Sequence, residues 1–94
     1  MPPAQPMRDE ETWSFKEIDA RHGCAKGTAF RAFKRTRAEL EEGADFHYLE
    51  AAAHAERIAE LKRRGRIYAS TVNAVLLTES GYARLKQHLP PPRE

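Results

Sequence analysis

The sequence predicts a mostly helical α+β domain with a small β-hairpin, and three observations carry this fold class. A serine or threonine followed three positions later by glutamate, the capping-box spacing, occurs at Ser14 and at Thr36. Apolar residues recur at helical spacing in several segments. Residues 66–78, in contrast, are rich in the β-branched and aromatic residues that favour strands. The 94 residues suit one folded unit rather than several.

We expect the folded unit to span residues 12–89. Residues 1–11 contain three prolines and few apolar side chains that a core could use, and residues 90–94 begin with three further prolines. Proline donates no backbone hydrogen bond, so these ends are predicted to be a disordered N-terminal arm and a disordered tail.

The first helix is predicted to begin after Ser14. The Ser14 hydroxyl and the Glu17 carboxylate can satisfy two backbone amides reciprocally, and Trp13 before the cap can pack on Ile18 as a hydrophobic staple. Gly23, about eight residues further on, supplies the permissive backbone that a turn after a helix needs. The first helix is therefore short.

A second helix is predicted over residues 27–35, because Ala29, Ala32 and Phe33 fall on one face of it. That face is suited to packing. The opposite face is cationic and carries Arg31, Lys34 and Arg35.

Beyond residue 35 the chain is predicted to form several further elements. The capping-box pattern at Thr36 can start a new short helix that ends before Gly43, but one continuous helix over residues 27–42 is a competing interpretation that propensity cannot exclude. The other segments are a short strand at 45–49, a helix over 51–64 ended by Gly65, one strand or a hairpin over 66–78, and a helix over 79–89 capped by Thr78 and stopped by Pro90.

The net charge of +2 conceals a separation of the charges into blocks. Residues 26–37 contain five basic residues and no acid, residues 39–50 contain five acids and no lysine or arginine, and residues 62–66 hold a second basic cluster. A polyanion such as nucleic acid, which releases counterions when its phosphates are neutralised, would suit such patches. A solvated helix face is the alternative.

Several classes of protein are not expected. No apolar run approaches the roughly 18 residues that cross a bilayer, and the first residues do not have the pattern of a secretory signal, so we expect a cytoplasmic protein. The single cysteine, Cys24, permits no internal disulfide, and the four histidines show no metal-ligand spacing. The sequence has no phosphate-binding loop and no nucleophile motif. We therefore predict no enzyme activity, cofactor, metal or small-molecule substrate.

Residues 15–34 combine an amphipathic helix, a glycine turn and a second amphipathic helix, which is helix-turn-helix geometry. This stretch resembles the helix-turn-helix of winged bacterial and phage DNA-binding proteins, of the MerR or excisionase and phage antirepressor kind. Residues 26–34 resemble a recognition helix, and residues 42–46 and 76–82 resemble segments of phage antirepressor amino-terminal domains. Two residues depart from the pattern: Asp19 replaces a usual alanine, and His22 a usual leucine. Asp19 fits if it points outward or caps a neighbour.

The resemblance implies a winged helix-turn-helix that binds double-stranded DNA sequence-specifically, with the helix 27–35 in the major groove. The protein would be bacterial or phage-encoded, associated with the nucleoid, and would act as a small transcriptional regulator or phage-type accessory factor. Predicted base-reading residues are Lys26, Gly27, Thr28 and Arg31. Predicted phosphate and backbone contacts are Lys34, Arg35 and Arg37, with Arg66, Ser70, Thr71 and Asn73 from a wing whose tip lies near residues 70–73.

Two further expectations concern Gly27 and the assembly. Gly27 would let a phosphate approach the amides at the start of the second helix, although a simple turn glycine is equally compatible. A homodimer is expected because a core of this size is thin and such proteins bind with two-fold symmetry.

The alternative function is a protein interaction module without nucleic-acid binding. In that case the apolar residues of 51–61 and 82–89 would form the interface, and the basic side chains of the second helix would pair with the acids of residues 39–50.

Overall fold

The computed structural model describes residues 12–92, and within them the chain is α+β as predicted. The predicted arm, residues 1–11, and residues 93–94 lie outside the described residues. In chain order the elements are β1 (Trp13–Ser14), α1 (Phe15–Arg21), α2 (Thr28–Thr36), the 3-10 helix η2 (Arg37–Glu39), β2 (Phe46–Leu49), α3 (Ala55–Arg63), β3 (Ala74–Leu77), α4 (Glu79–Leu85) and the 3-10 helix η3 (Lys86–His88).

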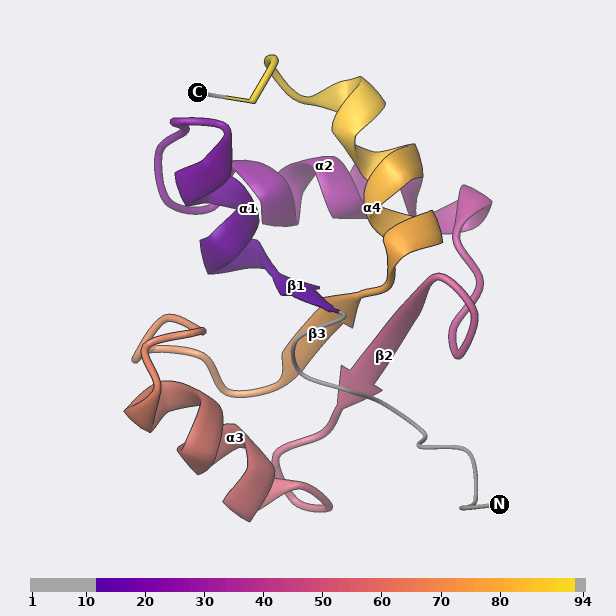
Figure 1. The fold of residues 1–94 in the computed structure, drawn as a ribbon. Coiled ribbons are helices and arrows are strands. Elements are labelled where there is room, and N and C mark those ends of the chain that lie inside the picture. Colours follow the sequence, from indigo (N-terminus) through magenta and orange to yellow (C-terminus); the bar gives the residue numbers. More distant parts are fainter. Residues whose placement is uncertain (1–11, 93–94) are drawn as a thin grey trace, which may run out of the picture.

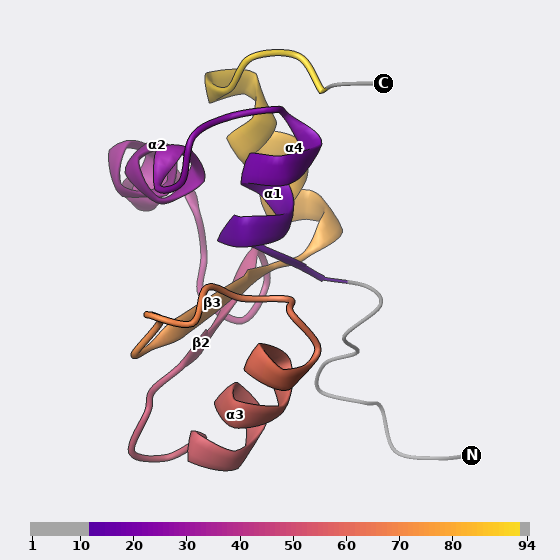
Figure 2. The same cartoon turned by 90° about the vertical axis from the view of Figure 1, so that its left-hand side faces the viewer.

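A three-stranded antiparallel sheet lies at the centre of the fold, with strand order β1-β3-β2. Helices α1, α2 and α4 cover one face of the sheet and α3 covers the other (Figures 1 and 2). All four residues of β3 are buried, which explains why Ala74–Leu77 is an uninterrupted apolar run. The middle strand therefore contributes side chains to both layers.

The alternation of side chains along the strands produces two apolar clusters. Val75 and Leu77 point to the helical layer and join a cluster with Ile18, Phe33 and Tyr82. Leu76, on the other face, joins a cluster formed with α3, whose members are Leu49, Ile58, Leu61, Ile67 and Ala74. Burial in both clusters holds α2 and α3 on opposite sides of the sheet.

Two of the predicted helix starts are confirmed. Ser14 caps α1 through a complete capping box with Glu17, and the Thr78 hydroxyl accepts from the Gly81 amide at 3.2 Å. The Trp13 ring stacks on the Tyr82 ring with a centroid separation of 5.0 Å. These caps are local in sequence, which is why the pattern of residue types was sufficient to find them.

The break after α2 is confirmed, but its predicted cause is wrong. Thr36 belongs to α2, and its buried hydroxyl donates to the carbonyls of Ala32 and Phe33 instead of capping the next helix. A threonine inside a helix can satisfy its hydroxyl by bonding back to the preceding turn. Residues 37–39 form only a 3-10 helix, so the continuous helix over residues 27–42 does not form.

Three predicted elements differ in extent from those observed. α3 is shorter than the predicted 51–64, since residues 51–53 form a turn, and the predicted helix over 79–89 ends at Leu85 and continues as η3. Of the two alternatives over 66–78, the single strand is correct and the hairpin is wrong, because only Ala74–Leu77 is a strand and its partners are β1 and β2. Residues 66–73 form a loop that connects α3 to β3, and Ile67 of this loop is buried beside α3.

The two departures from the helix-turn-helix pattern are both buried. His22 makes a hydrogen bond of 2.7 Å between Nε2 and the Tyr82 hydroxyl, and its Nδ1 contacts the Pro90 carbonyl. His22 thus joins the end of α1 to α4 and to the first residue of the predicted tail. Asp19 is 2% exposed and belongs to the site described next.

Candidate nucleic-acid interface

Helix α2 has one buried face and one cationic face, as its sequence predicts. Ala29 and Ala32 are fully buried and Phe33 is 7% exposed. Arg31, Lys34 and Arg35 lie on the exposed side of the same helix. Within residues 12–92 none of these three side chains forms an ion pair with an acid. The acidic block that follows α2 therefore does not neutralise this face.

Asp19 holds the start of α2. Its Oδ1 accepts from the Ala29 amide at 2.8 Å and its Oδ2 accepts from the Gly27 amide at 3.0 Å. The carboxylate therefore takes the place of an N-cap side chain and complements the positive end of the helix dipole. Of the two fits that the sequence left open for Asp19, capping a neighbour is correct and pointing outward is wrong.

The structure decides between the two interpretations of Gly27. Gly27 is the N-cap of α2 with a φ of 94°, a left-handed conformation that favours glycine, and its amide donates to Asp19 rather than toward a phosphate. The Thr28 hydroxyl donates to the Ala25 carbonyl at 2.7 Å. Because Asp19 already supplies the anion at this helix start, the turn glycine is the correct one of the two interpretations of Gly27. The base-reading roles of Lys26, Thr28 and Arg31 stay predictions.

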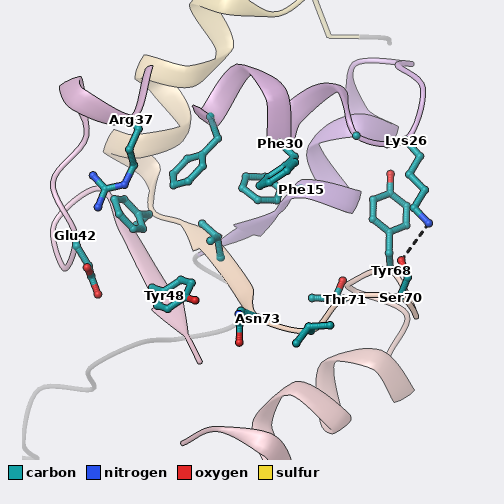
Figure 3. Close-up of a pocket in the computed structure, with 15 residues that line it drawn as sticks. Phe15, Lys26, Phe30, Arg37, Glu42, Tyr48, Tyr68, Ser70, Thr71 and Asn73 are labelled. Carbon is teal, nitrogen blue, oxygen red and sulfur yellow. Dashed lines mark hydrogen bonds between the residues drawn. The ribbon is translucent and has the colours of Figure 1, made fainter. Parts of the chain in front are cut away.

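Lys26 is held by the loop that precedes β3 (Figure 3). Its Nζ donates to the Ser70 hydroxyl at 3.2 Å and lies 4.9 Å from the centroid of the Tyr68 ring. The Tyr68 hydroxyl in turn donates to Asp19 Oδ2 at 2.6 Å. Burial raises the pKa of Tyr68, and the bond to Asp19 raises it further, so the phenol stays protonated and acts as a donor.

Not all of the predicted wing residues contact the residues at the start of α2. Ser70 contacts Lys26. Thr71 follows it in a turn, in which the Thr71 amide donates to the Tyr68 carbonyl at 3.0 Å. Asn73 instead accepts from the Ala51 amide at 2.8 Å and joins the loops on either side of α3. None of these residues lies at a hairpin tip.

Arg66 is not available for the predicted backbone contact. Its side chain is 13% exposed, and Nε donates to Glu17 Oε2 at 2.8 Å while Nη2 donates to the Thr12 carbonyl at 2.9 Å. Glu17, the second residue of the capping box, thus has an additional partner 49 residues away. The other basic residues of this cluster lie on α3 or at its end, across the sheet from α2, where Arg63 and Arg64 pair with Glu60.

The structure has a groove beside α2 that the sequence patterns did not predict. It has a volume of about 740 Å³ and lies between α2, the sheet and the loop 68–73 (Figure 3). Its walls are mainly aromatic and aliphatic, and the basic side chains of Lys26 and Arg37 also line it. The lining residues are Phe15, Lys26, Gly27, Phe30, Phe33, Arg37, Glu42, Phe46, Tyr48, Tyr68, Ser70, Thr71, Val72, Asn73 and Val75.

Arg37 lies at the opposite end of this groove from Lys26 (Figure 3). Its guanidinium carbon is 4.7 Å from the centroid of the Phe46 ring, and its Nη1 donates to the Leu40 carbonyl at 3.3 Å. Arg37 is exposed, so an anion can still reach it. The phosphate contact of Arg37 stays a prediction.

Comparisons with protein families, with curated proteins and with solved structures found no match to this chain. Within residues 12–92 there is no group of three or more histidine, cysteine, aspartate or glutamate side chains placed to hold a metal ion. No helix of the described part of the chain is long and apolar enough to span a membrane.

Proposed function

We propose that this protein is a winged helix-turn-helix protein that binds double-stranded DNA through α2, as a small regulator or phage-type accessory factor. The supporting observation is that Arg31, Lys34 and Arg35 project from one exposed face of a helix whose other face is buried. A rigid helix with free cations on one side is suited to the major groove, which is wide enough to admit it. Asp19 contributes by holding the helix start in one position.

The arrangement of elements supports the same proposal. α1 and α2 pack against each other across residues 22–27, although this connection is longer than the roughly three or four residues usual in such motifs. The antiparallel β2 and β3 follow α2 and take the place of the wing, with α3 inserted between them. A homodimer, in which each copy presents α2 to one half-site, is part of the proposal.

The interaction-module alternative is less well supported, because its apolar surfaces are used internally. Ile58 and Leu61 of α3 are buried against the sheet, and Tyr82 and Leu85 of α4 are buried in the helical layer. Only Leu89 of the second stripe is partly exposed beyond them. Apart from Leu89, the large apolar side chains of both stripes are thus already buried within this chain.

The test is a fluorescence anisotropy titration of the full chain with a labelled random-sequence 20-base-pair duplex at several salt concentrations. Log affinity should fall linearly with log salt, with a slope of about −0.9 for each phosphate neutralised. Lys34→Ala should reduce that slope by about 1. After selection of a preferred site, Arg31→Ala should lower the preference for that site over the random pool by about 5- to 150-fold, the range for loss of one bidentate base contact.

Lys62→Ala is the matched control, since Lys62 is an exposed cation on α3, across the sheet from α2. It should leave both the slope and the preference unchanged. Absence of duplex binding at low salt would refute the proposal. Equal losses from Lys62→Ala and Lys34→Ala would show that net charge, and not the face of α2, determines binding.

A further inference from the structure

The groove beside α2 concentrates the exposed apolar side chains of the molecule. The large hydrophobic residues that are exposed within residues 12–92 are Phe30 at 46%, Tyr48 at 44% and Val72 at 66%. All three line the groove, and they come from α2, β2 and the loop before β3. A patch of exposed apolar side chains that come together from separate elements is a feature of binding sites.

Cations are fixed over the aromatic rings of this groove. Lys26 lies over Tyr68 at one end, Arg37 lies over Phe46 at the other, and Lys34 Nζ is 5.1 Å from the Phe30 centroid at the edge. Glu42 is the acidic residue among the lining side chains, so the groove is net cationic. Its ligand should therefore combine flat or apolar groups with negative charges at a regular spacing.

We infer that this groove binds unpaired bases of single-stranded DNA. Single strands are bound by aromatic side chains on which bases stack, together with cations that follow the phosphates. Phe30 and Tyr48 present the ring surfaces, and Lys26 and Arg37 present charges at the two ends. The volume of about 740 Å³ falls within the range of ordinary ligand sites, roughly 300–1,000 Å³. The Ser70 and Thr71 hydroxyls lie at the lower edge, where they can bond base edges (Figure 3).

This inference goes beyond the proposed duplex binding and does not depend on it. A duplex on α2 would contact the outward Arg31 and Arg35, which do not line the groove, whereas Lys26 and Arg37 line it and belong to both proposals. Single strands would instead enter between α2 and the sheet. Tyr48 and Arg31 each belong to one proposal alone, so variants of these two residues separate the two activities.

The experiment measures anisotropy of a 5′-fluorescein decathymidylate and of a labelled duplex of ten base pairs with the full chain. Tyr48→Ala should weaken decathymidylate binding by about 5- to 150-fold, the range for one base stacked on an aromatic ring, and should leave duplex binding unchanged. Arg31→Ala should do the reverse if the duplex proposal is also correct. Should no duplex bind while Tyr48→Ala still weakens decathymidylate binding, the groove inference stands and only the duplex proposal fails.

Thermal melting checks that Tyr48→Ala folds, and a second measurement needs no variant. In a spectrum of the carbon-13-labelled full chain, decathymidylate should shift the Val72 methyl resonances upfield, because stacked bases carry ring currents. The inference is overturned if decathymidylate does not bind, or if Tyr48→Ala weakens duplex and single strand equally. It is also overturned if poly-glutamate displaces decathymidylate as well as the unlabelled oligonucleotide does.

The same spectra test other occupants of the groove. Nuclear Overhauser contacts between Val72 methyls and Met7 or the prolines of residues 1–11, in the free protein, would assign the groove to the N-terminal segment and overturn the inference. Shifts of the Val72 methyls with protein concentration would assign it to a second copy, with the same consequence.

Discussion

The substitution Asp19→Ala tests how the start of α2 is held. The Asp19 carboxylate accepts from three donors: the Ala29 amide at 2.8 Å, the Gly27 amide at 3.0 Å and the Tyr68 hydroxyl at 2.6 Å. Alanine removes every acceptor at once and leaves the donors in place. The effect on stability should therefore be large for a single residue.

The magnitude follows from the burial of each donor. The Ala29 amide is buried, and a buried donor without a partner costs about 1–3 kcal/mol. The Gly27 amide and the Tyr68 hydroxyl are partly buried and can turn to water, so each should lose only about 0.5–1.5 kcal/mol. We expect Asp19→Ala to lower the free energy of unfolding by about 2–6 kcal/mol, against a total of about 5–15 kcal/mol for a typical domain.

Urea unfolding followed by circular dichroism measures this loss, and two variants apportion it. Asp19→Asn keeps one acceptor oxygen and should lose about half as much, whereas Tyr68→Phe removes only the hydroxyl and should lose about 0.5–1.5 kcal/mol. Hydrogen exchange should become fastest at the Ala29 amide. The reasoning is refuted if Asp19→Ala unfolds within about 0.5 kcal/mol of the parent, the ordinary range for a surface change, with the Ala29 amide still protected.

Two other predictions concern the contact between α4 and the residues before β2. A Cβ at Gly81 would lie 1.8 Å from the Asp45 carbonyl oxygen, so Gly81→Ala should lower the free energy of unfolding by more than about 3 kcal/mol. The control is Gly65→Ala, where the space is open and only the φ of 72° opposes a side chain, so the loss should be about 1–2 kcal/mol. Similar losses for the two variants in urea unfolding would contradict the close approach at Gly81. Bonds from the Ser80 hydroxyl and the Glu41 amide, aided by Arg84, hold the pKa of Asp45 below its ordinary 3.8. A carboxylate whose pKa is lowered by folding stabilises the protein above the unfolded pKa, and this contribution is lost as pH falls below about 4. Melting temperatures of Asp45→Asn and the parent should therefore converge as pH falls from about 6 to 2, and a constant difference would refute the assignment.

Much of the local structure could be predicted because its causes lie within a few residues. The Ser14 capping box, the Thr78 cap and the two faces of α2 depend on spacings of three or four positions. The pattern also placed Arg31, Lys34 and Arg35 together on one exposed face. The same reasoning failed at Thr36, where the hydroxyl had a second local choice that residue type does not distinguish.

Contacts between distant residues could not be predicted in this way. Arg66 was assigned to a phosphate because it is basic and follows a basic cluster, but its partner Glu17 lies 49 positions away. The β-rich composition of residues 66–78 predicts one strand or a hairpin, but it does not predict that β3 pairs with β1 and β2. Strand partners are chosen by burial on both faces, which composition does not encode.

The sequence by itself determined where α1 and α4 begin, because their caps act over three residues. It also determined which side of α2 is cationic, since a helix repeats every 3.6 residues whatever surrounds it. Only the tertiary structure decided that the Asp19 carboxylate occupies the start of α2 and that Lys26 is held by Ser70. It alone formed the groove of Phe30, Tyr48 and Val72, because those side chains meet only when the sheet brings α2, β2 and the loop before β3 together.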